Sequence, residues 1–210
     1  LMVAWEKKTA EEALARGRDA NSLTDGEIWV DHILELQPNG EDEAIVVWEW
    51  HLWDHLVQDR NSELEGYGQV ADHPERLDIN FTRGNGDADW NHINAIDYNP
   101  ELDQILLSSH HMSEIYIIDH STTTQEAASH EGGARGRGGD LLYRWGNPQS
   151  YQRGTPADQK LFLQHDARWI EPGFAGAGQI MIFNNGSGRQ DGDYSSVDVM
   201  DPPLGEDGTY

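Results

Sequence analysis

The chain has 210 residues, a formal net charge of −24 at neutral pH and a hydrophobic content of 37%. This acidic excess argues against nucleic acid and anionic membrane surfaces as partners, because both are bound through clustered lysine and arginine. Cysteine is absent, so the sequence offers no disulfide framework, thiol nucleophile or thiolate metal site. No apolar run approaches the roughly 20 residues of a membrane-spanning helix.

The first 50 residues predict a strand, a short helix and a β-hairpin. Residues 1–5 are typical of a strand, and 9–18 of an amphipathic helix that starts with a capping threonine and has an acidic first turn. Two longer strands are expected at 28–36 and 44–50. The Gln-Pro-Asn-Gly sequence at 37–40 is a clear turn signal and predicts that these strands form a hairpin.

Three polar stretches interrupt the apolar segments of what we interpret as one partial domain over residues 1–210. Loop insertions are expected near 51–88, 121–139 and 146–160. Long loops inside a compact β domain are usually functional or mobile. None of their glycine-rich runs has the spacing of a nucleotide-phosphate loop.

Two histidines and two acids lie at the start of the first insertion. His51 and His55 would share one face if the segment were helical, and Asp54 and Asp59 lie beside them, which is one way to build a metal site. The glutamate of an H-E-x-x-H zinc motif is missing, and no further ligands are evident. We therefore favour buried hydrogen bonding or a pocket wall here, and predict no metal site.

One pattern occurs twice after residue 90. After His92, and again after His165, come a turn, an apolar strand that ends in small polar residues, and a second strand that ends in aspartate. A weaker copy of the pattern lies upstream, in the segments at 28–36 and 44–50. A further strand that ends at Trp145 extends the repeated unit to four strands. Repeated sheet units indicate a β-propeller, so we predict an all-β fold with about three blades in this chain. The strands of this part are expected at 105–109, 114–119, 141–145, 180–184 and 195–200.

Three residues are candidates for chemistry. His92 and His165 share one position of the repeat, and Arg189 follows a glycine-rich loop. Equivalent segments of neighbouring blades meet near a propeller axis, so we expect the two imidazoles within roughly 10 Å of each other. Arginine offers a planar fork to sulfate or phosphate oxygens, and histidine transfers protons or acts as a nucleophile. Each histidine taken alone could have a purely structural role, either on the surface or in an internal hydrogen bond. Packing, however, does not require histidine at the same position of both repeats.

Four segments carry a resemblance to a known family. They are Val47–His55, Asp89–Ala95, Ile105–Ser109 and the stretch from Gln164 to Arg189 that includes Phe183-Asn184-Asn185-Gly186. In their order and spacing they resemble the bacterial arylsulfotransferases, the arylsulfate sulfotransferases that do not use the nucleotide sulfate donor. The chain departs from the family at His110, where many members carry arginine, and it lacks the cysteine pair that some members have.

The resemblance implies a six-bladed β-propeller with its active site at the central channel. Members move a sulfuryl group from an aryl sulfate to an acceptor phenol through a sulfohistidine. A phenolate is a good leaving group, so we expect no metal and no cofactor. The resemblance also implies a periplasmic or secreted protein, with homodimer formation left open. This chain is then a fragment that lacks both ends, and its nucleophilic histidine lies beyond Tyr210.

The resemblance also assigns roles to single residues. His92 corresponds to the histidine that binds or protonates the sulfated oxygen, whereas His165 and Arg189 belong to the sulfate-binding and catalytic set. Substrate contacts are expected from four further side chains, of which the two tryptophans would stack on the phenol ring. These are Asn94, His110, Trp90 and Trp169.

Two other functions remain open from the residues alone, because a fold does not fix a function. One is a non-catalytic propeller that acts as an interaction platform, and the other is a metal-dependent hydrolase on the same fold. A further histidine facing the channel would favour sulfuryl transfer. A ring of aspartate, asparagine and glutamate on the channel would favour the hydrolase.

Overall fold

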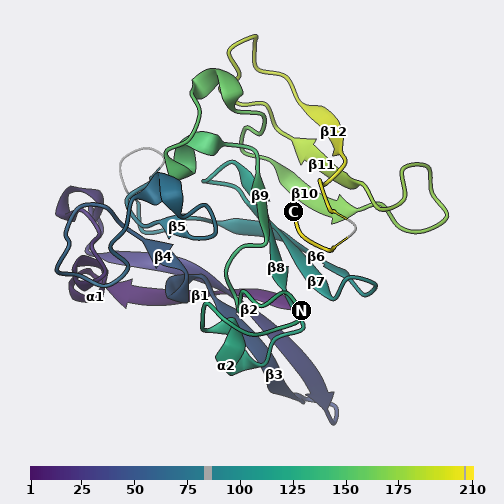
Figure 1. The fold of residues 1–210 in the computed structure, drawn as a ribbon, viewed down its shortest axis with the longest axis horizontal. Coiled ribbons are helices and arrows are strands. Elements are labelled where there is room, and N and C mark those ends of the chain that lie inside the picture. Colours follow the sequence, from purple (N-terminus) through teal and green to yellow (C-terminus); the bar gives the residue numbers. More distant parts are fainter. Residues whose placement is uncertain (83–86, 206) are drawn as a thin grey trace.

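The computed structural model describes residues 1–82, 87–205 and 207–210. Within these residues the secondary structure is mostly β, with three antiparallel sheets that follow one another along the chain (Figure 1). The predicted β class is confirmed at this level. Among the described helices, none has both the length and the apolar character needed to cross a bilayer.

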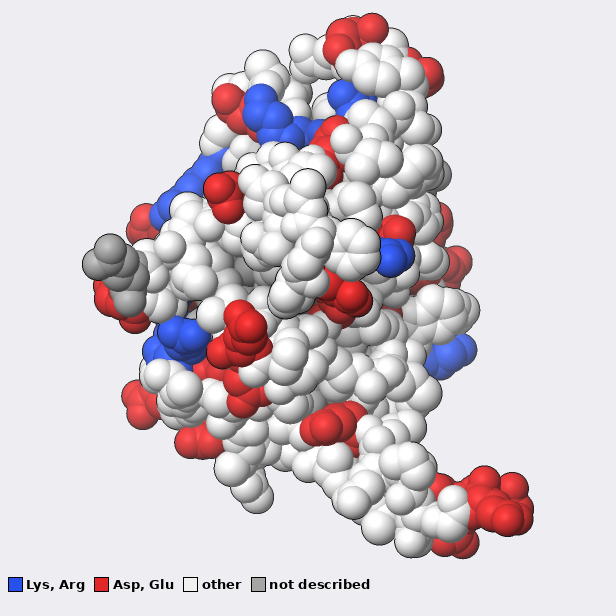
Figure 2. All heavy atoms as spheres, turned by 90° about the vertical axis from the view of Figure 1, so that its right-hand side faces the viewer, with Lys and Arg blue, Asp and Glu red and all other residues white. Residues whose placement is uncertain are grey.

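The first sheet consists of β1 (Met2–Thr9), β2 (Glu27–Asn39) and β3 (Glu43–His51), in that order. The hairpin predicted between the second and third strands is confirmed, but its strands are longer than expected. Their pairing continues to Asn39 opposite Glu43, so the turn lies at 40–42 and not at 37–40. The hairpin projects from the body of the protein, and its acidic tip is visible as the arm at the lower right of Figure 2.

The predicted N-terminal helix is present but short. α1 (Ala10–Ala15) begins after Thr9, whose hydroxyl oxygen accepts a hydrogen bond from the Glu12 backbone N–H at 3.2 Å. The Glu12 carboxylate accepts in return from the Thr9 backbone N–H at 2.7 Å, which completes a capping box. The helix stops before residue 18 because Gly17 adopts a left-handed conformation with φ of 86°.

The three predicted insertions consist mainly of turns and connections, with a few short elements. The first, expected as a loop insertion, contains a two-stranded parallel ladder of β4 (Leu56–Val57) and β5 (Leu77–Asp78). Its residues 83–86 lie outside the described part. The second insertion contains α2 (Thr124–Ala127). Short 3₁₀ helices lie at Ala20–Ser22, Leu52–Asp54, Val70–Asp72, Pro148–Tyr151 and Pro156–Asp158.

The second sheet is the four-stranded unit that the repeat predicted. Its strands are β6 (Ile93–Asn99), β7 (Gln104–Ser109), β8 (Glu114–Asp119) and β9 (Tyr143–Trp145), paired in this order. The third sheet consists of β10 (His165–Trp169), β11 (Ile180–Asn184) and β12 (Ser196–Met200). Five of these strands lie inside the expected ranges or within one residue of them, namely β7, β8, β9, β11 and β12, whereas the sequence did not reveal β6 and β10 as strands.

The second sheet lies between the other two, and its side chains alternate between them. Along β7, Ile105 and Leu107 join a core that includes Trp48 and Trp50 of the first sheet. Leu106 points the other way, into a core that includes Ile180 of the third sheet. β8 alternates in the same manner. Because both faces of these strands are covered, their sequences are nearly continuous apolar runs.

Candidate functional site

Four imidazoles meet where the second and third sheets begin, and we call them the histidine rim: His92, His110, His111 and His165. His92 directly precedes β6, His110 and His111 form the turn between β7 and β8, and His165 begins β10. The ring of His110 lies 5.3 Å from that of His92 and 5.1 Å from that of His165, centroid to centroid. The His111 ring lies 5.0 Å from His92. The two repeat histidines are therefore joined through His110.

The backbone presents His92 and His165 in related ways. His92 itself is left-handed, with φ of 49°, whereas after His165 it is Asp166 that is left-handed, with φ of 54°. Such a conformation is uncommon for residues other than glycine. A register shift follows in each case, between Ile93 and Ala95 in one sheet and between His165 and Arg168 in the other. Each bulge re-aims the side chain at the start of its sheet's first strand.

A buried carboxylate from the first sheet fixes the backbone around His92. Oδ2 of Asp31 in β2 accepts hydrogen bonds from the Asn91 side-chain amide and from the Ile93 backbone N–H, both at 2.6 Å. These donors flank His92 on either side. Asp31 is fully buried, and this burial raises its pKa from 3.8 to about 7.

The Nδ1 atoms of three rim histidines face hydrogen-bond acceptors. Nδ1 of His92 lies 2.5 Å from Oδ2 of Asp89, and Nδ1–H of His111 donates to the backbone oxygen of Asp89 at 2.8 Å. Nδ1–H of His165 donates to the side-chain oxygen of Asn185 at 2.8 Å. Since these oxygens only accept, the Nδ1 atoms carry the protons, and Nε2 is the nitrogen left for chemistry.

A buried glutamine holds His165 against the second sheet. The side-chain amide of Gln164 donates to Ser108 Oγ at 3.1 Å, to the Ser109 carbonyl at 3.0 Å and to the Glu114 carbonyl at 2.8 Å. Asn94, a predicted substrate residue, donates from its side chain to the Gln164 carbonyl at 2.8 Å. In this structure, therefore, Asn94 helps to position the neighbour of His165.

Arg189 lies in the connection between β11 and β12. Its guanidinium donates to Ser196 Oγ at 2.6 Å and to Tyr194 Oη at 3.3 Å, and lies 4.6 Å from the Tyr194 ring centroid. Among the described residues, none of its hydrogen bonds goes to the histidine rim. Asn185, the partner of His165, belongs to the same connection. The predicted contact of Arg189 with the anion stays a prediction.

The two tryptophans assigned to the substrate lie inside the protein. Trp90 is 2% exposed, and its indole N–H donates to the Phe81 carbonyl at 2.7 Å, while Trp169 is 7% exposed. Trp90 therefore offers almost no exposed face to a substrate ring, whereas Trp169 lines the cleft between β6 and β10, and its contact with substrate stays a prediction. Trp5 of β1 is instead 50% exposed, and its ring centroid lies 6.3 Å from that of His92.

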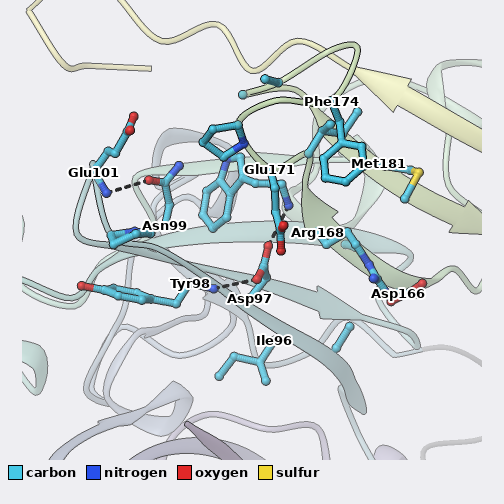
Figure 3. Close-up of a pocket in the computed structure, with 18 of the residues that line it drawn as sticks. Ile96, Asp97, Tyr98, Asn99, Glu101, Asp166, Arg168, Glu171, Phe174 and Met181 are labelled. Atoms are coloured by element: carbon cyan, nitrogen blue, oxygen red, sulfur yellow. Dashed lines mark hydrogen bonds and ion pairs between the residues drawn. The ribbon is translucent and has the colours of Figure 1, made fainter.

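A cleft of about 1610 Å³ lies between β6 and β10 (Figure 3). Asn94 and His165 line it, whereas the other three rim histidines do not. Asp97 of β6 connects the two sides of the cleft, because its Oδ2 accepts a hydrogen bond from the backbone N–H of Trp169 in β10 at 2.7 Å. Phe174 and Met181 form part of the opposite wall in Figure 3. Of the four rim histidines, His165 alone lines the cleft. We therefore place the candidate site at the histidine rim and not in the body of the cleft.

The histidines of the first insertion do not form a pair. His51 ends β3, where its ring stacks on His32 at 4.9 Å and its Nδ1 lies 3.4 Å from Glu6. His55 follows a 3₁₀ helix and is fully buried, with hydrogen bonds to Asp140 and Ala127. The segment is not α-helical, so the shared face required for a His51–His55 metal site is absent. The predicted buried hydrogen bonding is confirmed for His55.

Four residues of the site did not emerge from the sequence as candidates: Trp5, Asp31, Asp89 and Asn185. Asp89 and Asn185 lie inside the segments that carried the family resemblance, which was the available signal for them. Trp5 and Asp31 are directly opposite each other in the β1–β2 ladder. Only that pairing, which sequence does not reveal, brings them to the rim.

Comparison with protein families gives one match. The family model described as Arylsulfotransferase (ASST) matches residues 10–201, which include all four rim histidines, Asp31, Asp89 and Arg189. No curated protein sequence matches the chain.

Proposed function

We propose, from the premise that this chain belongs to the arylsulfotransferase family, that its histidine rim binds the sulfuryl group of an aryl sulfate and passes it to an acceptor phenol. One observation carries the proposal. His92, directly before the second sheet, and His165, at the start of the third, both contact the ring of His110. Three imidazoles together can supply N–H donors to a sulfate ester when their Nε2 atoms are protonated, inside a protein of net charge −24.

The first half of the reaction transfers sulfur to nitrogen. The lone pair of a neutral imidazole nitrogen attacks sulfur, the S–O bond to the aromatic ring breaks, and its electron pair leaves with the phenolate oxygen. His92 gives that oxygen a proton. It is suited to this step because the Asp89 carboxylate, 2.5 Å from its Nδ1, stabilises the imidazolium form. The products are a sulfohistidine and a phenol.

The second half returns the sulfuryl group to oxygen. The acceptor phenol gives its proton to His92, which is now neutral, and its oxygen attacks sulfur. The N–S bond breaks, and its electron pair returns to the imidazole nitrogen. The histidine that carries the sulfuryl group is proposed to be a further one that faces this rim, because His92, His110 and His165 hold the substrate.

Two residues have supporting roles in this proposal. The Arg189 guanidinium donates hydrogen bonds to the sulfuryl oxygens. To do so it exchanges its present acceptors, Ser196 Oγ and Tyr194 Oη, for the substrate. Trp5, exposed beside His92, offers an aromatic face to the phenol ring. Trp5 thus takes the role that the sequence gave to Trp90.

The same premise supports a proposal about the whole protein. We infer a six-bladed β-propeller, with the three antiparallel sheets as blades of one partial domain over residues 1–210. The burial of the second sheet on both faces supports this, because blades stack face to face. A periplasmic or secreted location and a homodimer are proposed from the family resemblance alone.

The experiment is a transfer assay with a chromogenic aryl sulfate, with and without an acceptor phenol. The proposal predicts that release of the coloured phenol depends on the acceptor and that the acceptor gains the sulfuryl group. Arg189→Lys should lower turnover by more than about tenfold, because lysine keeps the charge but loses the fork. Arg137→Lys, at an exposed arginine, is the matched control. Acceptor-independent release of inorganic sulfate would show a hydrolase instead.

A further inference from the structure

A second cluster of polar side chains lies away from the histidine rim. Nδ1 of His55 and Nδ1 of His130 each lie 2.8 Å from the same oxygen of Asp140, Oδ1. The three residues come from separate parts of the chain, namely the segment after β3, the insertion after α2 and the connection into β9. Their potential ligand atoms all lie within 4.8 Å of one another.

The ring of His55 is held with Nδ1 directed at this cluster. Its Nε2–H donates to the Ala127 carbonyl at 2.8 Å, and the Trp50 ring stacks on it at 5.5 Å, only 5° from parallel. A side chain at Gly139 would come within 2.6 Å of His55 Nε2, so the ring has little room to turn. A histidine that binds a metal almost always donates its other N–H to such an acceptor.

The two imidazoles of the cluster share one carboxylate oxygen as their partner. Nε2 of His55 must carry a proton, because a carbonyl only accepts. Nδ1 of His55, whose side chain is 0% exposed, faces the same carboxylate oxygen as Nδ1 of His130. A metal ion among the three atoms would take the place of protons at the Nδ1 atoms, because a histidine binds a metal through the lone pair of a neutral imidazole.

The rest of the cluster suits such an ion. The other oxygen of Asp140, Oδ2, lies 3.9 Å from Nε of Arg76, which can hold the carboxylate from behind. The His130 side chain is 43% exposed, so it offers an entry path and room for a water as fourth ligand. Two imidazole nitrogens and one carboxylate oxygen are a common zinc ligand set.

We propose that His55, His130 and Asp140 bind one divalent transition metal ion of the zinc class. Tetrahedral bonds of about 2.0–2.1 Å place ligand atoms roughly 3.3 Å apart, so the present contacts of 2.8 Å need only a small expansion. The ion would fasten the 121–139 insertion to the segment that follows β3.

The test uses Co²⁺ as a spectroscopic substitute for Zn²⁺, added to chelator-treated protein. We expect one Co²⁺ per chain with the visible absorption of tetrahedral coordination, displaced by Zn²⁺. His130→Ala should weaken binding by at least about tenfold, since even the loss of a partner behind a ligand costs that much. It should also abolish the rise in unfolding temperature that Zn²⁺ produces. His73→Ala is the matched control, because His73 is paired with Glu75 at 2.9 Å but lies outside the cluster.

A second variant separates this site from the other group of candidate ligands, Asp89, His92 and His111. The inference predicts that His111→Ala keeps the tetrahedral Co²⁺ signal and the Zn²⁺ stabilisation. Binding that survives in His130→Ala and disappears in His111→Ala would place the ion at the histidine rim and overturn the inference. A parental protein that gives no Co²⁺ signal and no Zn²⁺ stabilisation would overturn it as well.

Discussion

The two histidine clusters of this protein use the same residue type in opposite ways. At the rim, His92, His111 and His165 are partly exposed, and each has Nδ1 at an acceptor. In the cluster of His55, His130 and Asp140, which we call the buried cluster after its two buried members, both ring nitrogens of His55 are engaged and the ring lies against Trp50. A histidine with a fixed ring and an available nitrogen can exchange protons or attack sulfur. One whose nitrogens are both engaged and buried can hold segments together.

This difference predicts separable effects of mutation. Changes at the rim should reduce transfer and leave the free energy of unfolding nearly unchanged. Changes in the buried cluster should reduce the free energy of unfolding first, and activity only through it.

The largest effect is expected for His165→Ala. Loss of a positioned imidazole costs about 10²–10⁴ in rate where it takes part in proton transfer or binds the reacting group. We expect transfer from a chromogenic aryl sulfate to fall into this range, while the unfolding midpoint changes little. His73→Ala, at another partly exposed histidine, is the control. Equal losses of activity and stability would mean that His165 is a structural residue.

Asp140→Ala should give the largest loss of stability. It removes the common acceptor of His55 and His130 from a buried site, and breaking such a pair costs about 3–5 kcal/mol. Denaturant unfolding measures the change. Glu41→Ala makes the same change of charge on the exposed hairpin tip and should be nearly silent. If the two variants unfolded alike, the buried cluster would not fasten the insertion.

Asp89→Asn tests how the negative charge beside His92 affects transfer. Asparagine keeps an acceptor for Nδ1 of His92 but removes the negative charge that stabilises its imidazolium. We expect kcat to fall about 10–100-fold, less than loss of the acid itself, with KM little changed. Asp87→Asn, two residues away and exposed, is the control. A change confined to KM would assign Asp89 to substrate binding.

The smallest effect concerns pH. Burial raises the pKa of Asp31 from 3.8 to about 7 in the folded protein. Between these values the folded protein keeps a proton that the unfolded chain has released, so Asp31 makes stability fall as pH rises from about 4 to 7. Asp31→Asn removes this titration and keeps an acceptor for the Ile93 N–H. Its unfolding midpoint should therefore vary less over that range, whereas exposed Asp42→Asn should follow the parent.

Much of the fold follows from local sequence patterns. β7, β8 and β11 are dense in β-branched and apolar residues, and the turn formers around them fix their ends within a residue or two. β6 and β10 were missed because their sequences, INAIDYN and HDARW, are rich in polar residues and contain a bulge that breaks the alternation. Yet these two strands carry or follow the repeat histidines.

The site was predictable only where the repeat supplied long-range information. The equivalent positions of His92 and His165 led to the expectation that they lie near each other, and His110 now links them. The pairing of His55 with Asp140, 85 positions apart, has no local signal. Which tryptophan is exposed also depends on how the sheets stack, so Trp5 could not be chosen over Trp90 from sequence.

The most direct test of the rim as the sulfuryl site is a crystal structure with an aryl sulfonate, an unreactive analogue of the substrate. The account predicts the sulfonate group at the rim, with its oxygens about 3 Å from Nε2 of His92 and of His165, and the aromatic ring beside Trp5. A sulfonate bound in the cleft beside Asp97 and Phe174, with the rim histidines untouched, would contradict it.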